Sequence, residues 1–169
     1  MSSSDQTVAF IGLGNMGAPM VANLCSKGFA VRAYDVAVDA LEKATAVGCV
    51  ACDSAAVAVD GADVVVTMLP NGDIVERLLI DEQRILESMQ KGALLIDCST
   101  VAASSSLRVH ECADSLGVLC LDAPVSGGVG AAKAGTLAFM CGGTEQAFAA
   151  AQTVSVSYTH LTLPTTLVV

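Results

Sequence analysis

The chain has 169 residues and a mass of 17.0 kDa, which suits one domain of ordinary size or a part of a larger protein. Hydrophobic residues make up 53% of the chain and its net charge is −9, so a disordered chain is excluded and nucleic acid and anionic membrane surfaces are disfavoured as partners. No apolar run is long enough for a membrane span, and the N-terminus lacks the pattern of a signal peptide. We therefore expect a cytoplasmic protein whose seven cysteines are reduced and mostly buried.

Strand and helix patterns alternate along the chain. A strand over residues 7–11 is followed by a helix over 15–26, a strand over 29–34, a helix over 39–47, a strand over 49–52 and a helix over 54–59. Next come a strand over 63–69, a helix over 74–89, a strand over 93–97, a helix over 104–116 and a strand over 118–121. After a small, glycine-rich segment over 124–135, a last strand is predicted over 136–141 and a helix from 144 to 152. Because the strand runs are apolar throughout, we predict an α/β fold with a doubly wound parallel sheet.

A G-x-G-x-x-G motif follows the first predicted strand and opens the first helix, with the sequence Gly12-Leu13-Gly14-Asn15-Met16-Gly17. Gly12 would permit the tight turn, Gly14 would let the backbone approach a pyrophosphate, and Gly17 would let the helix pack on the strand. The phosphates would lie at the helix N-terminus, where N–H groups and the dipole favour anions. The motif predicts a Rossmann-like dinucleotide site, and a glycine turn without a ligand is the alternative.

Asp35 ends the second predicted strand, 23 residues after Gly12. At this spacing an acidic side chain receives the adenine ribose hydroxyls and repels a 2′-phosphate. Asp35 therefore favours NAD over NADP, with nearby Arg32 as a complication. The alternative is a surface acid that merely follows a strand.

Two later strands end in segments that we expect to line the ligand crevice, since the crevice of an open α/β sheet lies at the carboxyl ends of its strands. These segments are Met68-Leu69-Pro70 and Asp97-Cys98-Ser99-Thr100. For Ser99 and Thr100 a role as the N-cap of the next helix is an equally good interpretation.

Residues 122–128, with the sequence Asp-Ala-Pro-Val-Ser-Gly-Gly, offer a hydroxyl and consecutive backbone N–H groups that suit a carboxylate. A plain glycine loop is the alternative. We expect His110 to be structural and Lys133 to be solvated, and the Cys49–Cys52 pair is not expected to bind a metal. The residues by themselves thus predict a dinucleotide-binding domain without an evident acid or base for hydride chemistry.

These motifs together resemble the β-hydroxyacid dehydrogenase family, especially its 3-hydroxyisobutyrate dehydrogenase members. The resemblance spans about residues 6–153 and rests on residues 10–17, 68–70, 97–100, 122–128 and 135–137. The stretch over 127–132 is closer to hydroxyisobutyrate members than to tartronate semialdehyde members.

The resemblance implies a set of binding residues and a reaction. NAD contacts are implied at Gly12, Leu13, Gly14, Asn15, Met16, Gly17, Asp35, Leu69, Pro70 and Thr100, and the substrate carboxylate is implied at Ser126, Gly127 and Gly128. The implied reaction is the reversible oxidation of 3-hydroxyisobutyrate to methylmalonate semialdehyde in valine breakdown. The alternatives are tartronate semialdehyde reductase, another β-hydroxyacid dehydrogenase, or a stand-alone dinucleotide-binding module without turnover.

Two features of the C-terminal part depart from the family pattern. The family's catalytic lysine lies in a G-x-x-G-x-G-x-x-x-K segment that leads into an all-helical domain, through which full-length members associate, and this chain contains neither. Residues 156–165 instead resemble the translation of a transposon-end adapter used in sequencing libraries. We expect an NAD-binding domain over residues 1–154, inactive by itself, and a non-native read-through tail over 155–169. A genuine threonine-rich β tail over 161–169 is the alternative.

Overall fold

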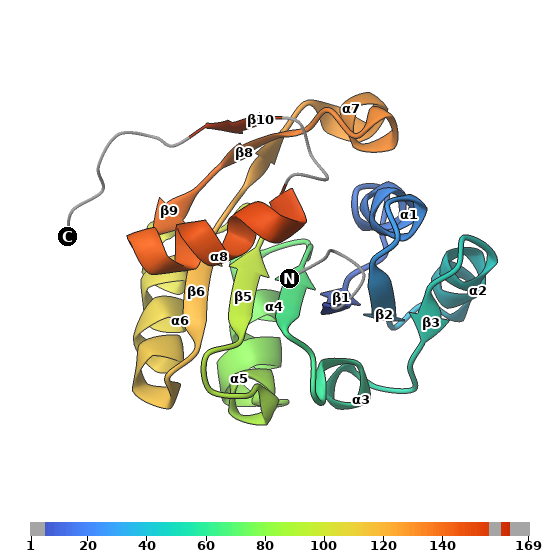
Figure 1. The fold of residues 1–169 in the computed structure, drawn as a ribbon. Coiled ribbons are helices and arrows are strands. Elements are labelled where there is room, and N and C mark those ends of the chain that lie inside the picture. The colour runs from blue at the N-terminus through green and yellow to red at the C-terminus, as the bar shows by residue number, and fades with distance from the viewer. Residues whose placement is uncertain (1–5, 156–159, 163–169) are drawn as a thin grey trace.

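Helices and strands alternate in the computed structural model of the chain, which describes residues 6–155 and 160–162 (Figure 1). The strands are β1 (Thr7–Ile11), β2 (Ala30–Tyr34), β3 (Val50–Ala51), β4 (Val64–Thr67), β5 (Leu94–Asp97), β6 (Leu119–Asp122), β7 (Val125–Ser126), β8 (Ala138–Met140), β9 (Gly142–Gly143) and β10 (His160–Thr162). The helical segments are α1 (Gly17–Ser26), α2 (Val38–Ala46), α3 (Ala55–Val59), α4 (Gly72–Glu76), the π-helical turn η2 (Arg77–Asp81), α5 (Ile85–Ser88), α6 (Ala103–Leu116), α7 (Gly128–Ala134) and α8 (Glu145–Ser155).

The main sheet has the strand order β3-β2-β1-β4-β5-β6-β9. All neighbouring pairs from β3 to β6 are parallel, which confirms the predicted doubly wound α/β fold. The edge strand β9 is antiparallel to β6 and was not predicted as a separate strand. The order reverses direction at β1, so the loops after β1 and β4 diverge at the carboxyl edge and leave room for a ligand there.

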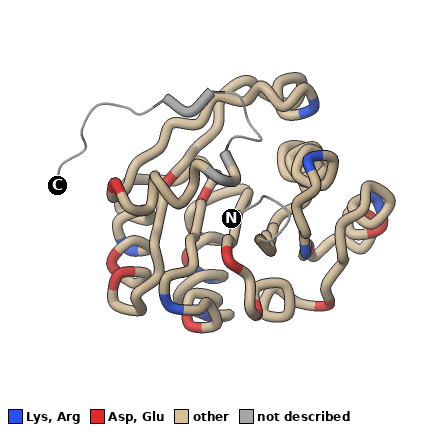
Figure 2. Tube along the Cα trace, viewed as in Figure 1, with Lys and Arg blue, Asp and Glu red and all other residues tan. Residues whose placement is uncertain are grey.

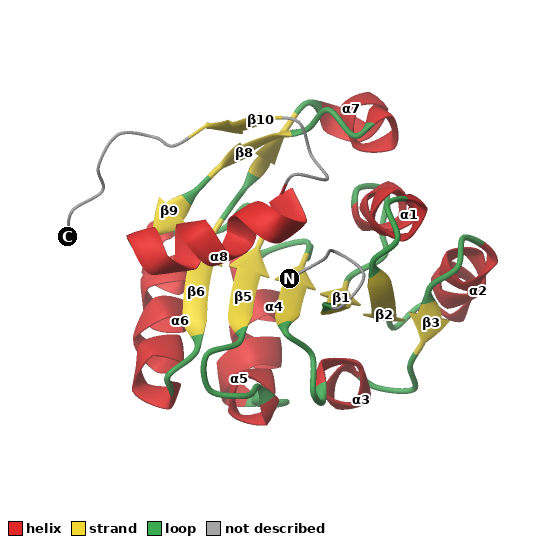
Figure 3. Cartoon of the chain, in the orientation of Figure 1, coloured by secondary structure: helices red, strands yellow, loops and turns green. Residues whose placement is uncertain are grey.

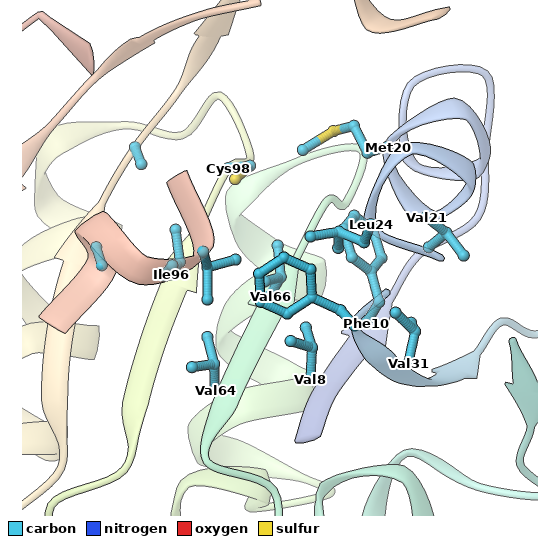
Figure 4. Close-up of a cluster of buried hydrophobic side chains, with 14 of the residues drawn as sticks. Val8, Phe10, Met20, Val21, Leu24, Val31, Val64, Val66, Ile96 and Cys98 are labelled. Atoms are coloured by element: carbon cyan, nitrogen blue, oxygen red, sulfur yellow. The ribbon is translucent and has the colours of Figure 1, made fainter. Parts of the chain in front are cut away.

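Helices cover both faces of the main sheet (Figure 3), and apolar side chains of the parallel strands contribute to a buried cluster on each face. In β1, Val8 and Phe10 contribute to a cluster that also includes residues of α1, α2 and α8, whereas Ala9 and Ile11 contribute to a second cluster with residues of α3 to α6. Figure 4 shows the Phe10 ring within the first cluster, near Leu24 of α1. The period of two in a strand sends neighbouring side chains to opposite faces, so a doubly covered strand must be apolar at every position.

The glycine-rich segment over 124–135 contains a short strand and a helix, which the sequence did not predict. Here β7 pairs antiparallel with β8, and α7 follows directly. The backbone of β10 pairs in parallel with β8, completing a second sheet in the order β10-β8-β7. Most of the predicted read-through tail lies outside the described residues, and its foreign origin stays a prediction.

The single helix predicted over residues 74–89 is wrong. The structure divides this segment into α4, η2 and α5, with Arg84 in the left-handed conformation at φ 49° before α5 begins.

Charged residues are spread over the outer helices and the loops of the fold (Figure 2). None of the helices within the described residues is long and apolar enough to span a membrane. All seven cysteines are free thiols, and five of them are buried, which agrees with the expectation of small apolar roles.

Candidate dinucleotide site

A cavity of about 500 Å³ opens at the carboxyl edge of the sheet, a volume in the range of small-molecule sites. Its walls come from the loop between β1 and α1, the end of β2, the segment after β4 and the α4–η2 segment. It brings together most of the predicted cofactor residues: Gly12, Gly14, Asn15, Met16, Gly17, Asp35, Leu69 and Pro70.

The three glycines of the loop have different structural surroundings, and each explains a different requirement for glycine. Gly12 has φ +99°, and a Cβ there would lie 2.3 Å from the Met68 carbonyl oxygen, so only glycine fits this turn beside β4. A Cβ on Gly17 would lie 1.9 Å from the Gly12 carbonyl oxygen, which explains how closely α1 packs on the turn. Gly14 is exposed, and a Cβ there would meet no atom within 4 Å, so its backbone borders the open cavity.

Asp35 is held in place by two backbone groups at the end of β2. Its Oδ2 accepts a hydrogen bond from the Leu13 N–H at 2.6 Å, and its Oδ1 accepts one from the Ala37 N–H at 2.8 Å. Leu13 therefore acts through its backbone, because its side chain is buried and does not line the cavity. Arg32 donates to the Asp60 carbonyl and does not line the cavity, and its effect on the choice between NAD and NADP stays a prediction.

A buried polar network fixes the Leu69 wall. Asp97 Oδ1 accepts hydrogen bonds from Thr67 Oγ1 at 2.8 Å and from the Ser99 N–H at 3.0 Å. Ser99 Oγ in turn accepts from the Leu69 N–H at 2.9 Å, so the ends of β4 and β5 are joined. Burial raises the pKa of the Asp97 carboxyl, and the hydrogen bonds from Ser99 and Thr67 oppose that rise.

The N-cap interpretation of Ser99 and Thr100 is wrong. The N-cap of α6 is Ala102, which makes no side-chain capping bond. The Ser99 hydroxyl instead accepts a hydrogen bond from the Leu69 N–H. Thr100 is exposed and does not line the cavity, so its cofactor contact stays a prediction.

The predicted carboxylate-binding residues are not brought to the cavity. Ser126 ends β7, Gly127 precedes α7 with φ +129°, and Gly128 begins α7. All three are exposed and lie outside the cavity lining. Their role toward a substrate stays a prediction.

Several cavity residues were missed by sequence reasoning. Tyr34 and Val36 flank Asp35; Ile74, Arg77 and Leu78 come from α4 and η2, and Glu82 and Gln83 directly follow η2. A helical period places Ile74, Leu78 and Glu82 on one face because they are four residues apart, so this signal could have found them, but it would have placed Arg77 on the other side from Glu82.

Other titratable groups at this end of the molecule lie outside the cavity. Asp122 of β6 is the register partner of Asp97 of β5. Burial, and to a smaller extent the negative charge of Asp97, raise the pKa of Asp122 to about 6. Burial lowers the pKa of His110, and Lys133 is exposed on α7. Among the described residues, no group of three or more acidic, histidine or cysteine side chains could hold a metal ion.

Comparisons with known proteins agree with this architecture. The family profile described as the NAD binding domain of 6-phosphogluconate dehydrogenase matches residues 7–161. Two relatives from Pseudomonas aeruginosa are each 46% identical to the chain: an NAD-dependent L-serine dehydrogenase over 140 residues, and a 3-hydroxyisobutyrate dehydrogenase over 147 residues. The matches cover 83% and 87% of this chain, but 47% and 49% of the relatives.

A solved structure shows the same fold. Mycobacterium tuberculosis 3-hydroxyisobutyrate dehydrogenase with L-serine matches with a TM-score of 0.89 at 44% identity, covering 96% of this chain and 54% of that one. The chain thus spans about half the length of the relatives it matches. These matches confirm the resemblance that the motifs indicated, and the chain belongs to the family of the NAD-binding domain of 6-phosphogluconate dehydrogenase.

Proposed function

We propose that the chain binds NAD in the cavity and forms the NAD-binding portion of an oxidoreductase that oxidises 3-hydroxyisobutyrate to methylmalonate semialdehyde. The observation that carries the proposal is the meeting of the glycine loop and Asp35 in one cavity at the carboxyl edge of a parallel sheet. The relatives named for this reaction support the choice of substrate. This reaction would place the enzyme in valine breakdown.

The cavity fits a dinucleotide. Gly14 leaves its side of the loop open, and the N-terminus of α1 carries no side-chain cap, so backbone N–H groups are available for a pyrophosphate. Asp35 presents a carboxylate to ribose hydroxyls, and its charge disfavours a 2′-phosphate. Val36, Ile74 and Leu78 offer apolar surface to a flat base. When bound, NAD supplies the hydride acceptor of the reaction.

For the substrate, we propose that Ser126 and the N–H groups of Gly127 and Gly128 hold the carboxylate. Chemistry at the hydroxyl also needs a base, which the resemblance assigns to a lysine segment that this chain does not contain. We therefore expect no turnover by this chain. L-Serine is a second candidate substrate because one relative is named for it and the solved structure contains it.

The cofactor proposal is tested by fluorescence titration of the chain with NADH and NADPH, using Asp35→Ala and the matched control Asp39→Ala. Asp39 is an exposed acid in the first turn of α2 and does not line the cavity. We expect tighter binding of NADH than of NADPH, and at least a roughly tenfold loss of NADH affinity or of cofactor preference in Asp35→Ala only. Equal affinity and preference in Asp35→Ala and the wild type would refute the assignment.

Turnover and substrate choice need separate measurements. NAD reduction by the chain with 3-hydroxyisobutyrate or L-serine would contradict the expected absence of a base. Calorimetry with each hydroxy acid in the presence of NADH would rank the two substrates by their dissociation constants, and tighter binding of L-serine would favour the second candidate.

A further inference from the structure

The π-helical turn η2 brings together two opposite charges that an α-helix would separate. Its closing bond runs from the Glu82 N–H to the Arg77 carbonyl oxygen at 2.9 Å, a separation of five residues. In an α-helix, residues five apart point about 140° away from each other around the axis. The wider turn returns Glu82 to the side of Arg77, where Nε–Oε1 is 2.7 Å and Nη2–Oε2 is 3.0 Å.

This ion pair lies in the wall of the proposed NAD cavity. Among the described residues that line the cavity, Arg77 is the one cation, and Asp35 and Glu82 are the acids. The hydrogen bond and charge of Glu82 raise the pKa of Arg77, and Arg77 lowers the pKa of Glu82, so both groups stay charged at neutral pH. Both side chains are more than half exposed, so the pair adds little to stability.

The outer side of the segment is fixed by a separate cation. Arg108 of α6 forms ion pairs with Glu76, at the end of α4, and with Asp81, at the end of η2, the latter at 3.1 Å. The carboxylates of Glu76 and Asp81 thus pair with Arg108 of α6, whereas the carboxylate of Glu82 pairs with Arg77. Since the segment is held from outside, the pair at the cavity does not need to hold it.

We propose that Glu82 is a specificity-determining residue that excludes NADP by occupying the Arg77 guanidinium. This inference rests on the proposed NAD site. The 2′-phosphate of NADP carries more than one negative charge at neutral pH and needs a cation, and arginine is the side chain that best matches a phosphate. Arg77 already donates from Nε and Nη2 to the two carboxylate oxygens of Glu82, and Asp35 adds a second negative charge, so the positive charge of the cavity is compensated and not available to a 2′-phosphate.

The test compares NADH and NADPH affinities in Glu82→Gln, in the double variant Arg77→Met/Glu82→Gln and in the control Glu87→Gln. The control breaks the Arg84–Glu87 ion pair, which is also exposed and lies outside the cavity. We expect Glu82→Gln to shift the affinity ratio toward NADPH by about tenfold. The double variant and the control should keep the wild-type preference for NADH.

Two results would overturn the inference: an unchanged ratio in Glu82→Gln, or an equal shift in the double variant, which would show that only the lost acidic charge matters. If the wild type binds neither cofactor, the proposed function fails together with this inference. If the wild type binds NADH and Glu82→Gln keeps its ratio, only the inference fails. Circular dichroism confirms that each variant is folded, and Glu82→Ala provides a second test if the glutamine variant melts early.

Discussion

Replacing single glycines of the loop by alanine should separate cofactor binding from folding. At Gly14 an added Cβ meets no protein atom within 4 Å, and the residue is not in the left-handed region. At Gly17 the same atom would lie 1.9 Å from the Gly12 carbonyl oxygen and 3.1 Å from Phe10 Cε1. We therefore expect Gly14→Ala to lose NADH binding with its fold intact, and Gly17→Ala to lose stability.

The magnitudes follow from these contacts. Overpacking costs about 1–3 kcal/mol, and alanine regains about 0.5–1 kcal/mol over glycine in a helix. Because the clash at Gly17 is with a backbone atom that cannot rotate away, we expect a net loss of about 2 kcal/mol, or a Tm about 4–8 °C lower. Gly14→Ala should gain about 0.4–1 kcal/mol by restricting the unfolded chain, while its methyl group occupies the space proposed for the pyrophosphate.

Thermal melting by circular dichroism and NADH titration measure the two effects. Gly130→Ala is the matched control: Gly130 lies in α7, has open space around its Cβ direction and does not line the cavity. It should keep wild-type affinity, whereas Gly14→Ala should bind NADH at least about tenfold more weakly. The reasoning is refuted if Gly14→Ala binds NADH as the wild type does, or if it melts as early as Gly17→Ala.

Two further predictions concern the polar groups behind the cavity. Ser99→Ala leaves the Leu69 N–H without its acceptor and should lower stability by about 1–2 kcal/mol and weaken NADH binding; an unchanged Tm and affinity would show that the network does not hold the wall. The folded-state pKa of Asp122 is raised from 3.8 to about 6, so the folded protein binds the proton more tightly and its stability falls as the pH rises from about 4 to 6. Asp122→Asn should therefore be more stable at pH 7 by about 1 kcal/mol after allowing for solvent screening, with a difference in Tm that vanishes near pH 4. A pH-independent difference would contradict this assignment.

The features that the sequence predicted are those set by local patterns. The apolar run over Thr7–Ile11 coincides with β1, and the glycines after it occupy the turn that their spacing indicates. Asp35 could be placed beside the loop because the carboxyl ends of neighbouring parallel strands share one edge, and its bond to the Leu13 N–H confirms that closeness.

The features that the sequence did not predict depend on tertiary contacts. Ser99 follows a strand and precedes a helix, so a capping role was equally plausible, and only the approach of Leu69 from the neighbouring strand decides the use of its hydroxyl. The edge strand β9 consists of Gly142–Gly143, residues with weak strand propensity, and it is defined by its pairing with β6.

The break between α4 and α5 is the most informative of these differences. Residues 74–89 have a helical period, yet an uninterrupted α-helix would place Glu82 away from Arg77. The chain instead forms a π-turn and places Arg84 in the left-handed conformation, and both are unfavourable for the local backbone. The π-turn brings Arg77 and Glu82 together in the wall of the cavity. A local rule broken beside a ligand cavity points to a demand of the site rather than of the fold. If that demand is the pairing of Glu82 with Arg77, deleting one residue between them should restore a regular helix in which the two lie four residues apart and still meet. The preference for NADH should then be kept, unlike in Glu82→Gln, while the shifted core residues of the segment lower the Tm.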